Sequence, residues 1–178
     1  MLKTNKLLYR IILIFNLIVI AAAAVVCLRV VVSQASNLFF RCSAICALLA
    51  IFSAGYYILQ GYTKNAAGYY RLFVGLFALA LLVDCVFSVV FTEDFEAMLL
   101  PGLAFVVVLL SFIGVDLGRT LSLILCGALV LISVGLLLTV LGQGSAAVEL
   151  GAVRIALACL FGIMTYAKYL DKRARGTK

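Results

Sequence analysis

Residues 70–91 read YRLFVGLFALALLVDCVFSVVF, and this stretch decides the fold class. A helix needs about 20 predominantly apolar residues to cross the hydrocarbon core of a bilayer, and this run is that long. Its charges are Arg71, at one edge, and Asp84, inside the run. The stretch therefore predicts a transmembrane helix with one acidic residue in its interior.

The rest of the chain has the same character. Of its 178 residues, 67% are hydrophobic and 12% are charged, whereas soluble domains have about 45–50% apolar and about 25% charged residues. We predict an all-α fold, a single integral membrane bundle of six transmembrane helices with short loops and no separate soluble domain. The spans are predicted at about residues 7–28, 42–60, 70–91, 98–115, 121–141 and 147–168, followed by a basic tail at 169–178.

Two of these spans have features that bear on where they start. The first begins like a signal peptide, with Ala21–Ala23 as a candidate cleavage site, but its apolar run continues to Val32, so we expect an uncleaved span. In the fourth, Pro101 falls in the predicted first turn, where a missing N–H has no cost. We therefore expect this proline to mark a helix start rather than a kink.

The charges predict the orientation of the bundle. With the N-terminus inside, almost all basic residues outside the spans are cytoplasmic, and Arg29 and Arg41 remain outside together with four acids. This distribution follows the positive-inside rule, so we predict a multi-pass protein of the cell membrane with both termini cytoplasmic. We therefore attribute the net charge of +7 to contact with the anionic membrane surface, and we expect no nucleic-acid partner.

The tyrosines support the same orientation. All eight fall at the predicted inner ends of spans, where tyrosine favours the boundary between lipid and water. We expect them to anchor the bundle there rather than to bind a ligand. They are Tyr9, Tyr56, Tyr57, Tyr62, Tyr69, Tyr70, Tyr166 and Tyr169.

Two charges inside predicted spans are the candidate site. Asp84 lies in the third span and Arg154 in the sixth, and a single charge at mid-helix costs roughly 2.5–3.5 kcal/mol on insertion scales. Counted along their helices, both lie about 12 Å below the outer end. We predict that they face each other as an intramembrane ion pair, which either fixes helix register or forms a polar site for a substrate or proton.

Small residues predict close helix packing inside the bundle. Ser43, Ala47, Ala50 and Ala54 share one face of the second span, and Ala152, Ala156 and Cys159 share one of the sixth. The six cysteines form no CxxC pair, so we expect them to pack as small apolar side chains. No metal site or cofactor site is predicted.

The chain contains no histidine, which removes the commonest general base and metal ligand. It also lacks a glycine-rich phosphate-binding loop, and its acids are scattered. We therefore predict that the protein is not an enzyme. Two roles remain open: a component that binds or transports a small solute, or a non-catalytic structural or regulatory subunit of a larger membrane complex. The sequence identifies neither a substrate nor a partner other than the lipid bilayer.

Overall fold

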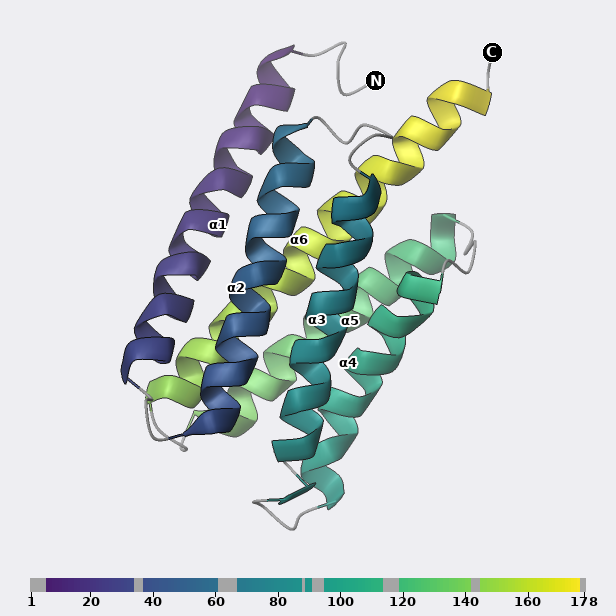
Figure 1. The fold of residues 1–178 in the computed structure, drawn as a ribbon. Helices are drawn as coiled ribbons and strands as arrows, with labels where there is room; N and C mark the ends of the chain where they lie inside the picture. The colour runs from purple at the N-terminus through teal and green to yellow at the C-terminus, as the bar shows by residue number, and fades with distance from the viewer. Residues whose placement is uncertain are drawn as a thin grey trace.

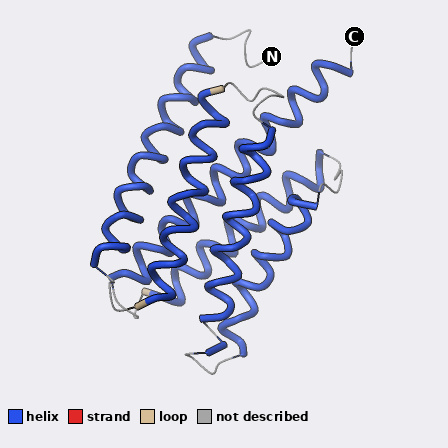
Figure 2. The backbone as a smooth tube through the Cα atoms, viewed as in Figure 1, coloured by secondary structure: helices blue, strands red, loops and turns tan. Residues whose placement is uncertain are grey.

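The computed structural model describes residues 6–33, 37–60, 67–87, 89–90, 95–113, 119–141 and 145–176. These residues form six α-helices, as predicted (Figures 1 and 2). The helices are α1 (Lys6–Ser33), α2 (Leu38–Leu59), α3 (Ala67–Phe87), α4 (Phe95–Ile113), α5 (Arg119–Val140) and α6 (Ser145–Gly176).

The helices run alternately up and down, so that the start of α1 and the end of α6 lie at the same end of the bundle (Figure 1). We call this the terminal end and the opposite one the distal end. Each helix packs against its neighbours in the chain, and α6 closes the ring by packing against α1 and also against α2. A side chain near the start of α6 is thereby brought to the same end as the start of α2 and the end of α3.

The outer surface carries many exposed apolar side chains. Large side chains such as Val25, Val32 and Leu131 are exposed, the last two by 78% and 73%. Four helices contain stretches long and apolar enough to cross a membrane, whereas the apolar stretches described in α4 and α5 are shorter. The four are Arg10–Ser33, Leu38–Leu59, Gly68–Phe87 and Ser145–Tyr166, and the shorter two are Leu99–Leu110 and Ile124–Thr139. Exposed apolar side chains on helices of this length fit a protein surrounded by lipid.

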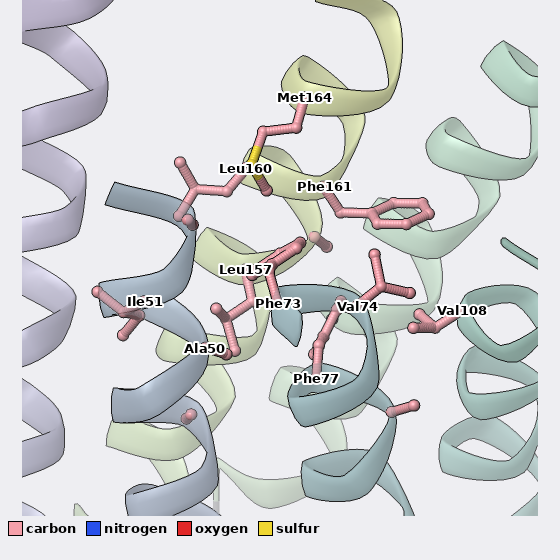
Figure 3. Close-up of a cluster of buried hydrophobic side chains, with 14 of the residues drawn as sticks. Ala50, Ile51, Phe73, Val74, Phe77, Val108, Leu157, Leu160, Phe161 and Met164 are labelled. Carbon is pink, nitrogen blue, oxygen red and sulfur yellow. The ribbon is translucent and has the colours of Figure 1, made fainter. Parts of the chain in front are cut away.

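The centre of the bundle is filled by buried apolar side chains from α2, α3, α4 and α6 (Figure 3). Phe73 and Phe77 lie one turn apart on α3, with ring centroids 6.0 Å apart, and both are fully buried. Phe161 of α6 is buried in the same cluster. Close packing of this layer separates the interior of the bundle into a distal part and a terminal part.

Helix α2 begins four residues before the predicted start, at Leu38 instead of residue 42. The cause is Asn37, whose Oδ1 accepts hydrogen bonds from the backbone N–H groups of Phe39 and Phe40, at 3.1 and 3.3 Å. An N-cap of this kind satisfies amides that have no partner within the helix, and asparagine is among the best residues for it. This capping residue directly precedes the helix and can be recognised in the sequence.

The prediction for Pro101 in the fourth span is wrong. Helix α4 begins at Phe95, three residues before the predicted start, so that Pro101 lies inside the helix and not in its first turn. A proline there lacks the N–H that would bond to the carbonyl four residues earlier. The Pro101 side chain is buried, so its packing inside the bundle helps to offset this loss.

Other boundaries also differ from the predicted ones, most of all at the ends of three helices. Helix α1 continues to Ser33, five residues beyond the predicted end at 28. Helix α3 ends at Phe87, four residues before the predicted end at 91. Helix α6 continues to Gly176 through most of the predicted tail at 169–178. Leucine, lysine, arginine and alanine are good helix formers, and cations are favoured near a helix C-terminus, so this polar segment extends the helix instead of ending it.

The small-residue face of α2 lies where it was predicted, because Ser43, Ala47, Ala50 and Ala54 are all buried. The prediction for α6 is wrong: Ala152 and Cys159 are exposed and Ala156 is only partly buried. Larger side chains of α6 face the bundle instead, where they fill the layer shown in Figure 3. Close approach of α6 to α5 depends on Gly151, where an added Cβ would lie 2.8 Å from Leu137 Cδ1.

Candidate functional site

The structure brings Asp84 and Arg154 together. Arg154 Nη2 lies 2.5 Å from Asp84 Oδ1, and the two side chains are 12% and 11% exposed. The pair joins α3 to α6 in the distal half of the bundle. Because the two charges are opposite and this close, each offsets most of the free-energy cost of burying the other in an apolar environment.

A third residue, Ser43 of α2, belongs to the same site. Its hydroxyl donates a hydrogen bond to Asp84 Oδ1, at 3.1 Å. Asp84 Oδ1 therefore accepts from both Arg154 and Ser43, and the polar cluster joins three helices. From the sequence, Ser43 is predicted only to contribute to helix packing. The missed signal is its depth, because Ser43 lies one turn from the start of α2 and Asp84 one turn from the end of α3.

The predicted equal depth of the two charges holds only roughly. Asp84 lies three residues before the end of α3, whereas Arg154 lies nine residues after the start of α6. At 1.5 Å per residue these are about 4.5 and about 14 Å of helix. The long arginine side chain and the oblique course of α6 across the bundle (Figure 1) bring the guanidinium to the carboxylate nevertheless.

Aromatic rings lie one helical turn toward the distal end from this cluster. Phe40 precedes Ser43 by three residues, Phe87 follows Asp84 by three, and their ring centroids are 5.2 Å apart. Phe39 lies 5.8 Å from Phe87 by the same measure. Because the buried phenylalanines of Figure 3 lie on the terminal side, the polar cluster has apolar layers both above and below it.

A second ion pair lies nearer the distal rim. Arg29 Nε of α1 is 3.4 Å from Glu149 Oε1 of α6, and the two side chains are 71% and 21% exposed. An exposed pair of this kind stabilises little, because water or headgroups already solvate the arginine. Arg29 and the four acids predicted on the outer side, of which Glu149 is one, are not paired by any pattern in the sequence.

In the terminal half, α3 and α6 are joined again, by a hydrogen bond between the hydroxyl groups of Tyr70 and Thr165 at 3.2 Å. Tyr70 and Tyr57 are buried, and their rings pack with centroids 5.6 Å apart. For these two residues the predicted role as surface anchors is wrong, because their rings face the bundle. The Tyr70 hydroxyl can be buried because Thr165 of α6 supplies a polar partner.

The remaining tyrosines with described side chains lie at the terminal end and are exposed, as the anchoring role requires. They are Tyr56, Tyr69 and Tyr166. Tyr62 and the side chains of Tyr9 and Tyr169 lie outside the described residues. One-sided placement therefore holds for the described tyrosines, although only some of them reach the surface.

Two buried groups have hydrogen-bonding atoms with no protein partner in the described part of the chain. Arg154 Nε is one of them, and the side-chain amide of Asn16 on α1 is the other. Arg154 Nε belongs to the same guanidinium that binds Asp84. The polar cluster therefore has one N–H hydrogen-bond donor without a protein partner among the described residues. All six cysteines are free thiols, and no three side chains of metal-ligating type come together among the residues described.

Comparisons with protein-family models, with curated proteins and with solved structures found no match to this chain. Its class therefore comes from the fold and the site alone. The chain is a helical membrane protein with a polar cluster inside its bundle.

Proposed function

We propose that the chain crosses the cell membrane six times and that both of its termini are cytoplasmic. The shared position of the start of α1 and the end of α6 supports this arrangement (Figure 1), as does the helical length of α4 and α5, 19 and 22 residues. At 1.5 Å per residue these helices are about 28 and 33 Å long, close to the thickness of a hydrocarbon core. The terminal end is then cytoplasmic and carries most of the basic residues.

Within this arrangement, the protein is a component that binds or transports a small solute, and its site lies in the outer half of the bundle. The observation that carries this proposal is the buried polar cluster of Asp84, Arg154 and Ser43. Ionisable side chains are costly inside a membrane and are retained mainly where they contact substrates, ions or protons. The two apolar layers around the cluster would separate a bound solute from both aqueous sides.

The protein acts without catalysing a reaction. Because the sequence contains no histidine, the commonest general base is missing. The carboxylate of Asp84 is held by Arg154 and Ser43, an arrangement that suits binding and positioning better than proton abstraction.

Mass spectrometry of the purified protein tests the solute site. The wild type and the double variant Asp84→Asn/Arg154→Gln are purified from native membranes under mild conditions, and their retained small molecules are compared. We expect a metabolite that accompanies the wild type and is lost from the double variant at equal protein recovery. Identical small-molecule profiles for the two proteins would refute the proposal. Arg29→Gln is the matched control, because it removes an arginine from the same end without touching the buried pair.

A structural or regulatory subunit is the second candidate, and one observation favours it. The buried charges are already paired with each other, and together with Ser43 they join α2, α3 and α6. Such a connection fixes the register of three helices without any ligand. A stoichiometric membrane protein that co-purifies with both the wild type and the double variant, with no retained metabolite, would favour this role.

A further inference from the structure

We infer that the solute is a small zwitterion with an apolar side chain, of the amino-acid type. This inference rests on the proposed solute site and specifies the chemistry of its ligand.

Charge balance at the site is the first step. The cluster contains one guanidinium and one carboxylate, paired within 2.5 Å and both almost entirely buried. In an apolar interior a charge without a partner is disfavoured far more than in water. A solute with a net charge would leave the site with an unbalanced charge of one sign, whereas a net-neutral solute would not.

The spare hydrogen-bonding group is the second step. Arg154 Nε is buried and has no protein hydrogen-bond partner among the described residues, although Nη2 of the same guanidinium binds Asp84. Guanidinium groups bind carboxylates through two adjacent N–H groups, so an open Nε favours a ligand that brings a carboxylate. The ammonium group of the same ligand then lies beside the carboxylate of Asp84, and it balances the negative charge of the ligand's own carboxylate.

The apolar layers are the third step. Phe40 and Phe87 lie one turn outward from the polar cluster, and Phe77 lies in the buried apolar cluster on the other side. A ligand whose charged groups lie at Arg154 and Asp84 therefore meets aromatic rings with the rest of its body. Desolvation of such contacts favours an aliphatic or aromatic side chain over a polar one.

Three solutes of nearly the same shape test the inference. Leucine is the zwitterion, 4-methylpentanoate is the same skeleton without the amino group, and 3-methylbutylamine is the same skeleton without the carboxylate. Binding to the full-length protein in lipid nanodiscs is measured by equilibrium dialysis, with phenylalanine, valine and methionine as further zwitterions. We expect at least one of these zwitterions to bind, and leucine to bind at least tenfold more tightly than both of its analogues.

Two variants assign the binding to the guanidinium. Arg154→Lys keeps the positive charge beside Asp84 but has no Nε, so we expect at least a tenfold loss of affinity with little change in melting temperature. Arg29→Gln should bind as the wild type does. Equal affinity of Arg154→Lys and the wild type would overturn the role of Nε.

The outcomes separate this inference from the proposed function. If none of the apolar zwitterions binds, or if the anion or the amine binds as tightly as leucine, the inference is wrong. The solute site itself still stands in that case if the purified protein retains another metabolite whose retention requires Asp84 and Arg154. If it retains none, both the inference and the proposed function fail.

Discussion

Removing one charge of the Asp84–Arg154 pair should destabilise the bundle about as much as removing both. The two side chains are 11% and 12% exposed, so either charge left alone has little access to water. Breaking a buried pair by removing one partner costs about 3–5 kcal/mol. We therefore expect Asp84→Asn and Arg154→Gln each to lower the free energy of unfolding by about 3 kcal/mol.

In the double variant no bare charge remains, and the two neutral amides can bond to each other. We expect a total loss of about 3 kcal/mol, compared with about 6 kcal/mol for the sum of the single variants, which gives a coupling energy of about 3 kcal/mol. Unfolding by sodium dodecyl sulfate in mixed micelles, followed by circular dichroism, measures all four proteins. A double variant that loses the full sum of the two single effects would show that the charges do not stabilise each other.

The pair of Arg29 and Glu149 is the matched control for this cycle. Its arginine is 71% exposed, and exposed pairs contribute about 0.2–1 kcal/mol. The same cycle with Arg29→Gln and Glu149→Gln should therefore give a coupling energy of at most about 1 kcal/mol. An equally large coupling at both pairs would mean that burial is not the cause.

Three further substitutions test the packing and the hydrogen bonds by the same unfolding assay. Gly151→Ala places a Cβ 2.8 Å from Leu137 Cδ1 and should lower the free energy of unfolding by about 1–3 kcal/mol. Gly127→Ala, whose added Cβ has nothing within 4 Å, is the control and should leave stability unchanged. Equal stability of the two variants would contradict the close α5–α6 contact. Ser43→Ala removes the hydroxyl donor to the carboxylate of the buried pair and should cost about 1 kcal/mol, and a neutral effect would remove the third member of the site. Tyr70→Phe loses only a hydroxyl hydrogen bond and should cost about 0.6 kcal/mol, and a loss above about 2 kcal/mol would show that this hydroxyl does more than bridge α3 to α6.

The sequence predicts the helices well because the signal is the length of each apolar run. About 20 apolar residues in a row are unlike anything in a soluble domain. The six predicted apolar runs coincide with the six helices of the structure, although the stretches described in α4 and α5 are shorter. The boundaries are less predictable, since they depend on local chemistry that hydropathy does not measure. Asn37 begins α2 by capping it, and good helix formers carry α6 through a segment that hydropathy excludes from the span.

The candidate site is predictable to the same extent. Asp84 and Arg154 are conspicuous because they are charges inside apolar runs. Ser43 is not, because a serine in a membrane helix can bond to its own backbone, as Ser53 and Ser133 do. Its role depends on a neighbour 41 positions away in the chain, and only the packing of α2 against α3 reveals that neighbour.

The direction in which each side chain points around its helix is also not predictable from this sequence. The belt of tyrosines was predicted from position along the helices, but burial depends on the angle around the helix axis. Tyr56 and Tyr57 are adjacent in the chain, yet one is exposed and the other buried. The same reason explains α6, where the small residues Ala152 and Cys159 face outward. Without knowing the neighbours of a helix, a uniformly apolar sequence does not indicate which face they cover.

Labelling of single cysteines by a membrane-impermeant thiol reagent tests the six crossings most directly. In a cysteine-free variant, one cysteine at a time is placed in each connecting segment, at Ala35, Thr63, Thr92, Leu117 or Gln143. Six crossings with both termini inside predict labelling of intact cells at positions 35, 92 and 143, and labelling of positions 63 and 117 only after permeabilisation. If positions 92 and 117 were labelled from the same side, α4 would not cross the membrane and the proposed arrangement would be wrong.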